Sequence, residues 1–176
     1  MCKENNTNEV GPVQEYLNNI KYDKNKTISN NEAIEYGSTI RTGTTLNHLF
    51  IFLTSLTMIM MMTIIDLPHH IDCTYKLCER GFPLLVFGIS DISGQFFPIA
   101  FSILSHEQED DFSTFFRTLL DFCRLLNLSP AINHLIQDAC GACGNAAVAC
   151  LGPNVKILMC FFHVQKKFND NGVSFV

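Results

Sequence analysis

Two aspartates are the residues of this sequence best suited to chemistry, because each lies in or directly beside an apolar stretch. Asp72 falls within HHIDCTYKL, a short run with β-branched and aromatic residues that is typical of a strand. Asp138 follows the apolar stretch 133–137. A carboxylate in an apolar strand is costly to bury unless it is paired or holds a metal. The partners of Asp72 therefore decide what the protein can do.

The elements that would position these acids follow from periodicity and turn residues. Three strand candidates separated by short turn-like stretches favour an antiparallel meander, with Pro98 marking the third as an edge strand. Phe and Leu at three- and four-residue steps then predict a helix that begins among acidic residues. The expected elements are strands at 69–77, 84–90 and 96–104, a helix at 112–126, a strand at 133–137, a small-residue helix at 139–150 and a buried apolar strand at 155–162.

The order of these elements brings the two acids together. Right-handed crossovers would place the later strands parallel to the first in one mixed α/β sheet, with helices on both faces. Neighbouring strands lie ~4.8 Å apart, so Asp72 and Asp138 would point into one place. Adjacent carboxylates repel unless a cation lies between them, and Mg²⁺ prefers carboxylate oxygen. One hypothesis is two-metal phosphoryl transfer on nucleic acid. The alternative is that each Asp caps a helix or binds backbone, as isolated Asp residues at strand ends usually do.

Several stretches, taken in order, resemble the transposase domain of Mutator-like elements (MULE). They are H-I-D-C-T-Y-K-L, G-F-P-L-L-V-F-G-I-S-D, F-x-P-I-A-F-S-I, E-x-x-x-D-F-x-x-F-F, I-Q-D-A at 136–139 and M-C-F-F-H at 159–163. The resemblance implies an RNase H-like fold, as in retroviral integrases, and DNA strand cleavage and transfer by a DDE triad with Mg²⁺ or Mn²⁺. It also implies transposon-end DNA as the partner and a nuclear location. It makes Asp72 and Asp138 the first two catalytic and metal-binding acids, and Cys160 and His163 the C-x-x-H pair after the last strand.

The third acid of that triad, a Glu on a later helix, has no counterpart in this sequence. Residues 1–47 also lack the Cys/His spacing of a zinc-binding DNA-recognition domain. We therefore expect residues 69–176 to form a C-terminally truncated transposase core that is inactive or very weak. The loss of one ligand should cost much of the rate, because the metals supply the electrostatic stabilisation.

The N-terminal third of the chain divides into two segments. Residues 1–47 are polar and Asn-rich and are expected to form a flexible leader. Residues 48–68 contain the uncharged run 49–65, which we expect to pack on the core or, alternatively, to form a membrane helix, since ~17–25 apolar residues span a bilayer. Two alternative functions follow: a non-enzymatic DNA- or protein-binding remnant, and a small membrane-anchored protein. A homo-oligomer is one possible assembly, and a small-molecule substrate is not expected.

The net charge of −5 argues against tight DNA binding by the whole surface. Eight scattered cysteines without a secretory signal indicate reduced, intracellular thiols.

Four of the Cys and His residues follow the pattern C-x2-C-x16-C-x2-H. Cys140, Cys143, Cys160 and His163 formally match a structural zinc site, although buried thiols are the favoured interpretation. Cys140 and Cys143 could also form a redox pair, because a helix N-terminus lowers a thiol pKa. His163 is interpreted as joining the last strand to its helix rather than as a catalytic group.

Overall fold

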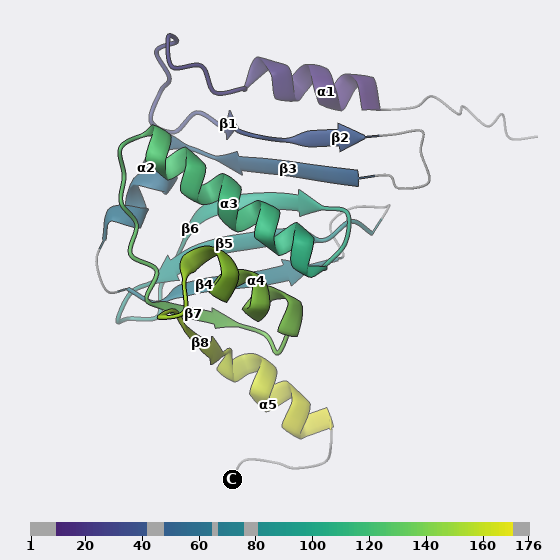
Figure 1. Ribbon diagram of the computed structural model, residues 1–176, viewed down its shortest axis with the longest axis vertical. Helices are drawn as coiled ribbons and strands as arrows, with labels where there is room; N and C mark the ends of the chain where they lie inside the picture. Colours follow the sequence, from purple (N-terminus) through teal and green to yellow (C-terminus); the bar gives the residue numbers. More distant parts are fainter. Residues whose placement is uncertain (1–9, 42–47, 65–66, 76–80, 171–176) are drawn as a thin grey trace, which may run out of the picture.

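The computed structural model describes residues 10–41, 48–64, 67–75 and 81–170. These residues fold around one eight-stranded mixed sheet (Figure 1). In sheet order the strands are β1 (Ile34–Glu35), β3 (His48–Thr54), β6 (Phe96–Leu104), β5 (Leu84–Ser90), β4 (His69–Thr74), β7 (His134–Gln137) and β8 (Lys156–Met159), while β2 (Thr39–Arg41) pairs with β3.

The part of the sheet that carries Asp72 has the predicted arrangement. β4, β5 and β6 are antiparallel neighbours, whereas β7 lies parallel to β4 and β8 parallel to β7. The crossovers contain α3 (Glu109–Leu125) and α4 (Gly141–Leu151). The prediction of three antiparallel strands followed by two parallel strands with crossover helices is therefore confirmed.

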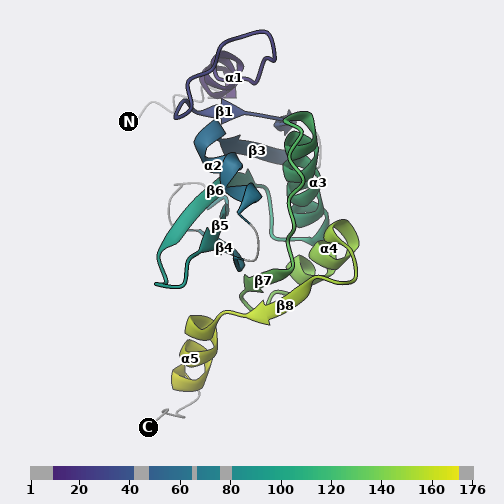
Figure 2. The ribbon, with the colours of Figure 1, turned by 90° about the vertical axis from the view of Figure 1, so that its left-hand side faces the viewer.

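Helices α3 and α4 cover one face of the sheet, as the edge-on view shows (Figure 2). α3 begins where the backbone N–H of Gln108 donates to Asp111 Oδ2 at 3.2 Å, and Asn127 ends the segment with a left-handed φ of 57°. Its apolar stripe meets the sheet, with the Phe115 ring 5.8 Å from Phe52 and 5.6 Å from Phe87. Burial of this aromatic cluster forms the main core.

The described part of the polar leader is structured, unlike the flexible segment we expected. Residues 10–41 contain α1 (Val10–Asn19), β1 and β2, and Leu17 is buried. Tyr22 and Tyr36 pack against Phe122 of α3 at ring distances of 5.1 and 4.8 Å. A few well-spaced apolar anchors thus hold a segment whose average composition is polar.

The uncharged run 49–65 contains a strand and a short helix. β3 pairs with β6 and places Phe50, Ile51 and Phe52 in the interior. Its aromatic and β-branched residues favour extended structure. Ser55 then caps α2 (Leu56–Met60), accepting the Met58 N–H at 3.2 Å, and the short 3-10 helix η1 (Met61–Thr63) follows. Within the described ranges, no helix has the length and apolar character needed to cross a bilayer.

β6 is not the edge strand that Pro98 suggested, because β3 pairs with its far side. That pairing covers only residues 101–104, so Pro98 lies beyond it. Pro98 instead faces Gly88 at a β-bulge between β5 and β6. A bulge tolerates proline as an edge does, since it also interrupts the ladder of backbone hydrogen bonds.

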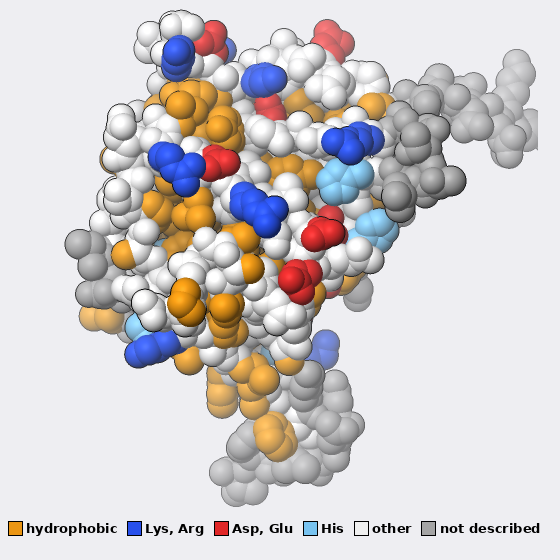
Figure 3. All heavy atoms as spheres, in the orientation of Figure 1, with side chains coloured by type: hydrophobic (Ala, Val, Ile, Leu, Met, Phe, Trp, Pro, Cys, Tyr) orange, Lys and Arg blue, Asp and Glu red, His pale blue; other side chains and the backbone are white. Residues whose placement is uncertain are grey.

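The C-terminal strand is shorter and more exposed than the buried strand predicted at 155–162. In this segment Lys156–Met159 is extended, and among the described strands it pairs with β7 alone. α5 (Phe161–Asp170) then leaves the sheet edge and projects away from α3 and α4 (Figure 2). Apolar side chains are consequently exposed where β8 meets α5, low in Figure 3: Leu158, Met159, Phe161 and Phe162.

Candidate active site

The register of two parallel strands places the two predicted acids next to each other. His69 of β4 pairs with Leu135 of β7, and His70 pairs with Ile136. Two residues further along, Asp72 and Asp138 occupy equivalent positions, although β7 itself ends at Gln137. Asp72 and Asp138 also line one small cavity, so the structure brings them together as expected.

Asp72 is not the buried charge that its apolar surroundings suggested. β4 alternates, with His69 and Ile71 buried and His70 and Asp72 on the more open face. The Asp72 side chain keeps 59% of its surface exposed. Its carboxylate is therefore solvated and accessible to a ligand.

The Asp138 side chain lies beside Asp72 and also accepts a hydrogen bond from the backbone. One of its oxygens, Oδ1, accepts the N–H of Cys140 at 3.1 Å in the turn that leads into α4. This contact fixes the carboxylate next to the helix N-terminus, where the helix dipole favours negative charge. The turn thus orients Asp138 at the end of β7.

A third acid lines the same cavity, and sequence reasoning missed it. The cavity, which we call the acid cavity, measures about 10 Å³ and is lined by Ile71, Asp72, Cys73, Glu107, Phe112, Asp138, Cys140 and Cys143. Among the described residues, the Oε1 atom of Glu107 is buried without a well-formed hydrogen bond. Glu107 opens the E-x-x-x-D-F stretch, so its position in that motif is the sequence signal that could have identified it.

Glu107 changes the acidity of two neighbouring groups. A hydrogen bond from the Tyr75 hydroxyl to the Glu107 carboxylate raises the pKa of Tyr75. The pKa of the Cys73 thiol is also raised, first by burial and then by the charge of Glu107. The raised pKa values keep both groups in the protonated, donating form over a wider pH range.

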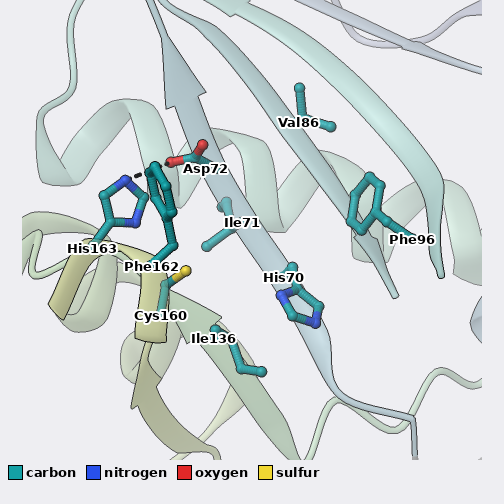
Figure 4. Close-up of a pocket in the computed structure, with 9 residues that line it drawn as sticks. All are labelled: His70, Ile71, Asp72, Val86, Phe96, Ile136, Cys160, Phe162 and His163. Carbon is teal, nitrogen blue, oxygen red and sulfur yellow. Dashed lines mark ion pairs between the residues drawn. The ribbon is translucent and has the colours of Figure 1, made fainter. Parts of the chain in front are cut away.

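His163 lies beside Asp72 and does more than join strand to helix. Its Nε2 atom is 3.9 Å from Asp72 Oδ1. A dashed line marks this pair in Figure 4. His163 and Cys160 line a second, larger cavity with Asp72 on the open face of the sheet. The C-x-x-H pair at the start of α5 is thus part of the surroundings of the candidate site.

The four residues of the formal zinc pattern are not gathered into one site. Cys140 and Cys143 line the acid cavity, whereas Cys160 and His163 line the larger cavity. In the part of the chain that the structure describes, no three His, Cys, Asp or Glu side chains are arranged to hold a metal ion. The six cysteines described are free thiols.

The structure also disfavours the hypothesis that Cys140 and Cys143 form a redox pair. The pKa of Cys143 is raised, chiefly by burial and then by the nearby Cys140. A raised pKa reduces the thiolate fraction on which thiol reactivity depends. Burial thus outweighs the effect of the helix N-terminus.

The two histidines of β4 have different environments. His69 is buried against Phe87, with ring centroids 5.6 Å apart, and neither ring nitrogen makes a well-formed hydrogen bond. Burial lowers its pKa to about 4, helped by His70 and only partly offset by the Leu67 backbone. His70 Nε2 lies 2.7 Å from Ser90 Oγ, so this side chain is held on the open face near Asp72.

Comparison with family models relates this chain to a known family. The family model of the MULE transposase domain matches residues 69–167, which is more than half of the chain. The match begins at β4 and ends within α5, so it covers Asp72, Glu107, Asp138 and His163. No curated protein matched the sequence.

Proposed function

Because the chain belongs to the MULE transposase family, we propose that its sheet is an RNase H-like core for DDE-type cleavage and transfer of DNA strands. The observation that carries this proposal is the β4–β7 register, which sets Asp72 and Asp138 side by side. The mixed sheet with crossover helices is compatible with such a core. Transposon-end DNA and a nuclear location are parts of the same proposal.

The two aspartates suit a hard divalent cation. Asp72 presents a solvated carboxylate, and Asp138 has one oxygen engaged by the Cys140 N–H and a second oxygen left for a ligand. Mg²⁺ is commonly held by one or two carboxylates together with water and substrate phosphate oxygens. Bound there, Mg²⁺ or Mn²⁺ would polarise the scissile phosphate and its attacking oxygen.

We further propose that the activity of this chain is low. Glu107 lines the acid cavity with Asp72 and Asp138, but among the described residues these three acids are not arranged to hold one ion. The two aspartates offset less cation charge than three ligands would, so metal and phosphate are bound more weakly. His163 also competes with a cation for Asp72 whenever the imidazole is protonated, because the two groups lie 3.9 Å apart.

Metal binding and DNA nicking by the same variants test the proposal. Mn²⁺ binding, measured by electron paramagnetic resonance, should weaken at least about 10-fold in Asp72→Asn and Asp138→Asn, since each removes a charged ligand. Any Mn²⁺-dependent nicking of supercoiled DNA should disappear with them. Asp121→Asn is the matched control, because Asp121 is exposed on α3 and pairs with Arg124. Equal Mn²⁺ affinity in all three variants would overturn the proposed site.

A non-enzymatic DNA- or protein-binding remnant is the second candidate. The exposed apolar side chains at the β8–α5 junction favour it. Retained DNA binding in a protein that binds no Mn²⁺ would support this candidate instead.

A further inference from the structure

The larger cavity lies directly beside Asp72 and has a composition unlike that of the acid cavity. It has a volume of about 390 Å³. We call it the aromatic groove; its lining comes from β4, β5, β6, β7 and the start of α5: His70, Ile71, Asp72, Val86, Phe96, Ile136, Cys160, Phe162 and His163. In Figure 4 the aromatic and imidazole rings surround the aliphatic floor of Ile71 and Ile136.

The charge of the groove excludes an anionic group as its occupant. Asp72 is its one acidic lining residue, and none of its lining residues is Lys or Arg. When no metal is bound at Asp72, a phosphate placed inside would face this carboxylate, with only the imidazoles of His70 and His163 to offset the charge. The groove therefore suits an uncharged group.

The rings of the groove suit a flat aromatic group. Phe96 and Phe162 remain 43% and 67% exposed, so their faces are open to a ligand. His163 Nδ1 is buried and has no hydrogen-bond partner in the described part of the chain, and the His70 ring is held by Ser90. Aromatic rings with a few polar atoms are the usual platform for an unstacked nucleobase.

We propose that the aromatic groove binds a single unstacked nucleobase of the DNA strand whose backbone passes Asp72. The volume is at the lower end of pockets that hold small organic groups and is too small for a helix or strand of a partner. The proposal rests on the proposed function only in taking DNA as the polymer. Base binding itself requires neither metal nor strand cleavage.

Phe162 and its neighbour Phe161 provide a matched pair for the test. Both begin α5 and are similarly exposed, at 67% and 70%, but only Phe162 lines the groove. Since both side chains are exposed, neither Phe162→Ala nor Phe161→Ala should unfold the protein. Phe162→Trp keeps an aromatic face and serves as the conservative variant.

The experiment measures the affinity of the full chain for single-stranded oligonucleotides at low salt, with one abasic residue moved along the strand. In the wild type, an abasic residue at one position should weaken binding about 5-fold or more. This factor corresponds to the lower end of the free energy that one base gains by stacking on an aromatic ring. This dependence of affinity on the abasic position, the position effect, should vanish in Phe162→Ala and persist in Phe161→Ala and Phe162→Trp. Photocrosslinking of an iodouracil-substituted strand at the same position should map to Phe162 or Phe96.

Two results would overturn the base site. Either no abasic position changes the affinity of the wild type, or an abasic residue weakens binding to Phe162→Ala as much as binding to Phe161→Ala. If Mn²⁺-dependent nicking is lost in Asp72→Asn but oligonucleotide binding shows no Phe162-dependent effect of abasic position, the base site is wrong and the proposed function stands. If oligonucleotide binding shows a Phe162-dependent effect of abasic position but the protein binds no Mn²⁺, the proposed function is wrong and the base site stands.

Discussion

His163 Nε2 lies 3.9 Å from Asp72 Oδ1, which links the first turns of α5 to the middle of β4. The Asp72 side chain is 59% exposed and that of His163 is 29% exposed. Water therefore screens the pair, and an ion pair of this kind contributes about 1 kcal/mol or less to folding. The pair matters because His163 limits the access of a cation to Asp72, rather than because it stabilises the fold.

A double-mutant cycle of Asp72→Asn and His163→Gln tests this assignment. The coupling free energy from urea unfolding should stay below about 1 kcal/mol at pH 6, because the charges are screened. A coupling of several kcal/mol would contradict the open, accessible site described for Asp72.

Acidification should destabilise the protein through His69. Its folded-state pKa is about 4 against 6.5 ordinarily, because burial disfavours the charged ring. The unfolded chain therefore binds more protons between these values, so the free energy of unfolding should fall as pH falls from about 6.5 to about 4. The slope should reach about 1 kcal/mol per pH unit.

His69→Leu should flatten this slope, because Leu does not titrate. Urea unfolding at several pH values measures the difference, with the exposed His106→Gln as control. His70, whose pKa burial also lowers, adds a contribution of the same sign in both proteins. An unchanged slope in His69→Leu would show that other groups cause the acid sensitivity.

Gly88→Ala should destabilise the β5–β6 hairpin. A Cβ at Gly88 would lie 2.4 Å from the Phe97 carbonyl oxygen and 2.4 Å from the Phe96 ring. The backbone at the bulge must shift, and overpacking of this kind costs about 1–3 kcal/mol. Chemical denaturation should detect the loss, whereas Gly141→Ala, where nothing lies within 4 Å, should leave the midpoint nearly unchanged.

Glu107→Gln should lower the pKa of Tyr75. The hydrogen bond to the Glu107 carboxylate is the main cause of its raised pKa, and a neutral amide accepts that bond more weakly. Ultraviolet absorbance during an alkaline titration follows tyrosinate formation, and Tyr75→Phe identifies which of the four tyrosines is responsible. A Tyr75 transition at the same pH in both proteins would show that Glu107 does not hold the hydroxyl.

Phe115→Ala should be the most disruptive of these substitutions. Phe115 is fully buried and contacts Phe52, Phe87 and Phe116. Truncation of a buried Phe costs about 3–5 kcal/mol, because it removes apolar contacts and leaves a cavity. Leu125→Ala on the same helix is 45% exposed and should change the unfolding free energy by under about 1 kcal/mol. Similar losses in the two variants would contradict the assigned core.

The sequence by itself determined the central part of the fold. Local periodicity and turn residues predicted β4, β5, β6, α3, β7 and α4 in order, because alternation and the helical repeat are properties of neighbouring residues. The rule for right-handed crossovers then placed β7 beside β4, which brought Asp72 and Asp138 together.

Only the tertiary structure decided what depends on contacts between distant segments. β3 pairs with β6 across more than 40 residues, so the first part of the uncharged run 49–65 became a strand of the sheet rather than part of a long helix. The same long-range packing brought Glu107 into the acid cavity and His163 to Asp72. Sequence pattern could not show these placements, because spacing along the chain does not determine which side chains meet when separate elements pack.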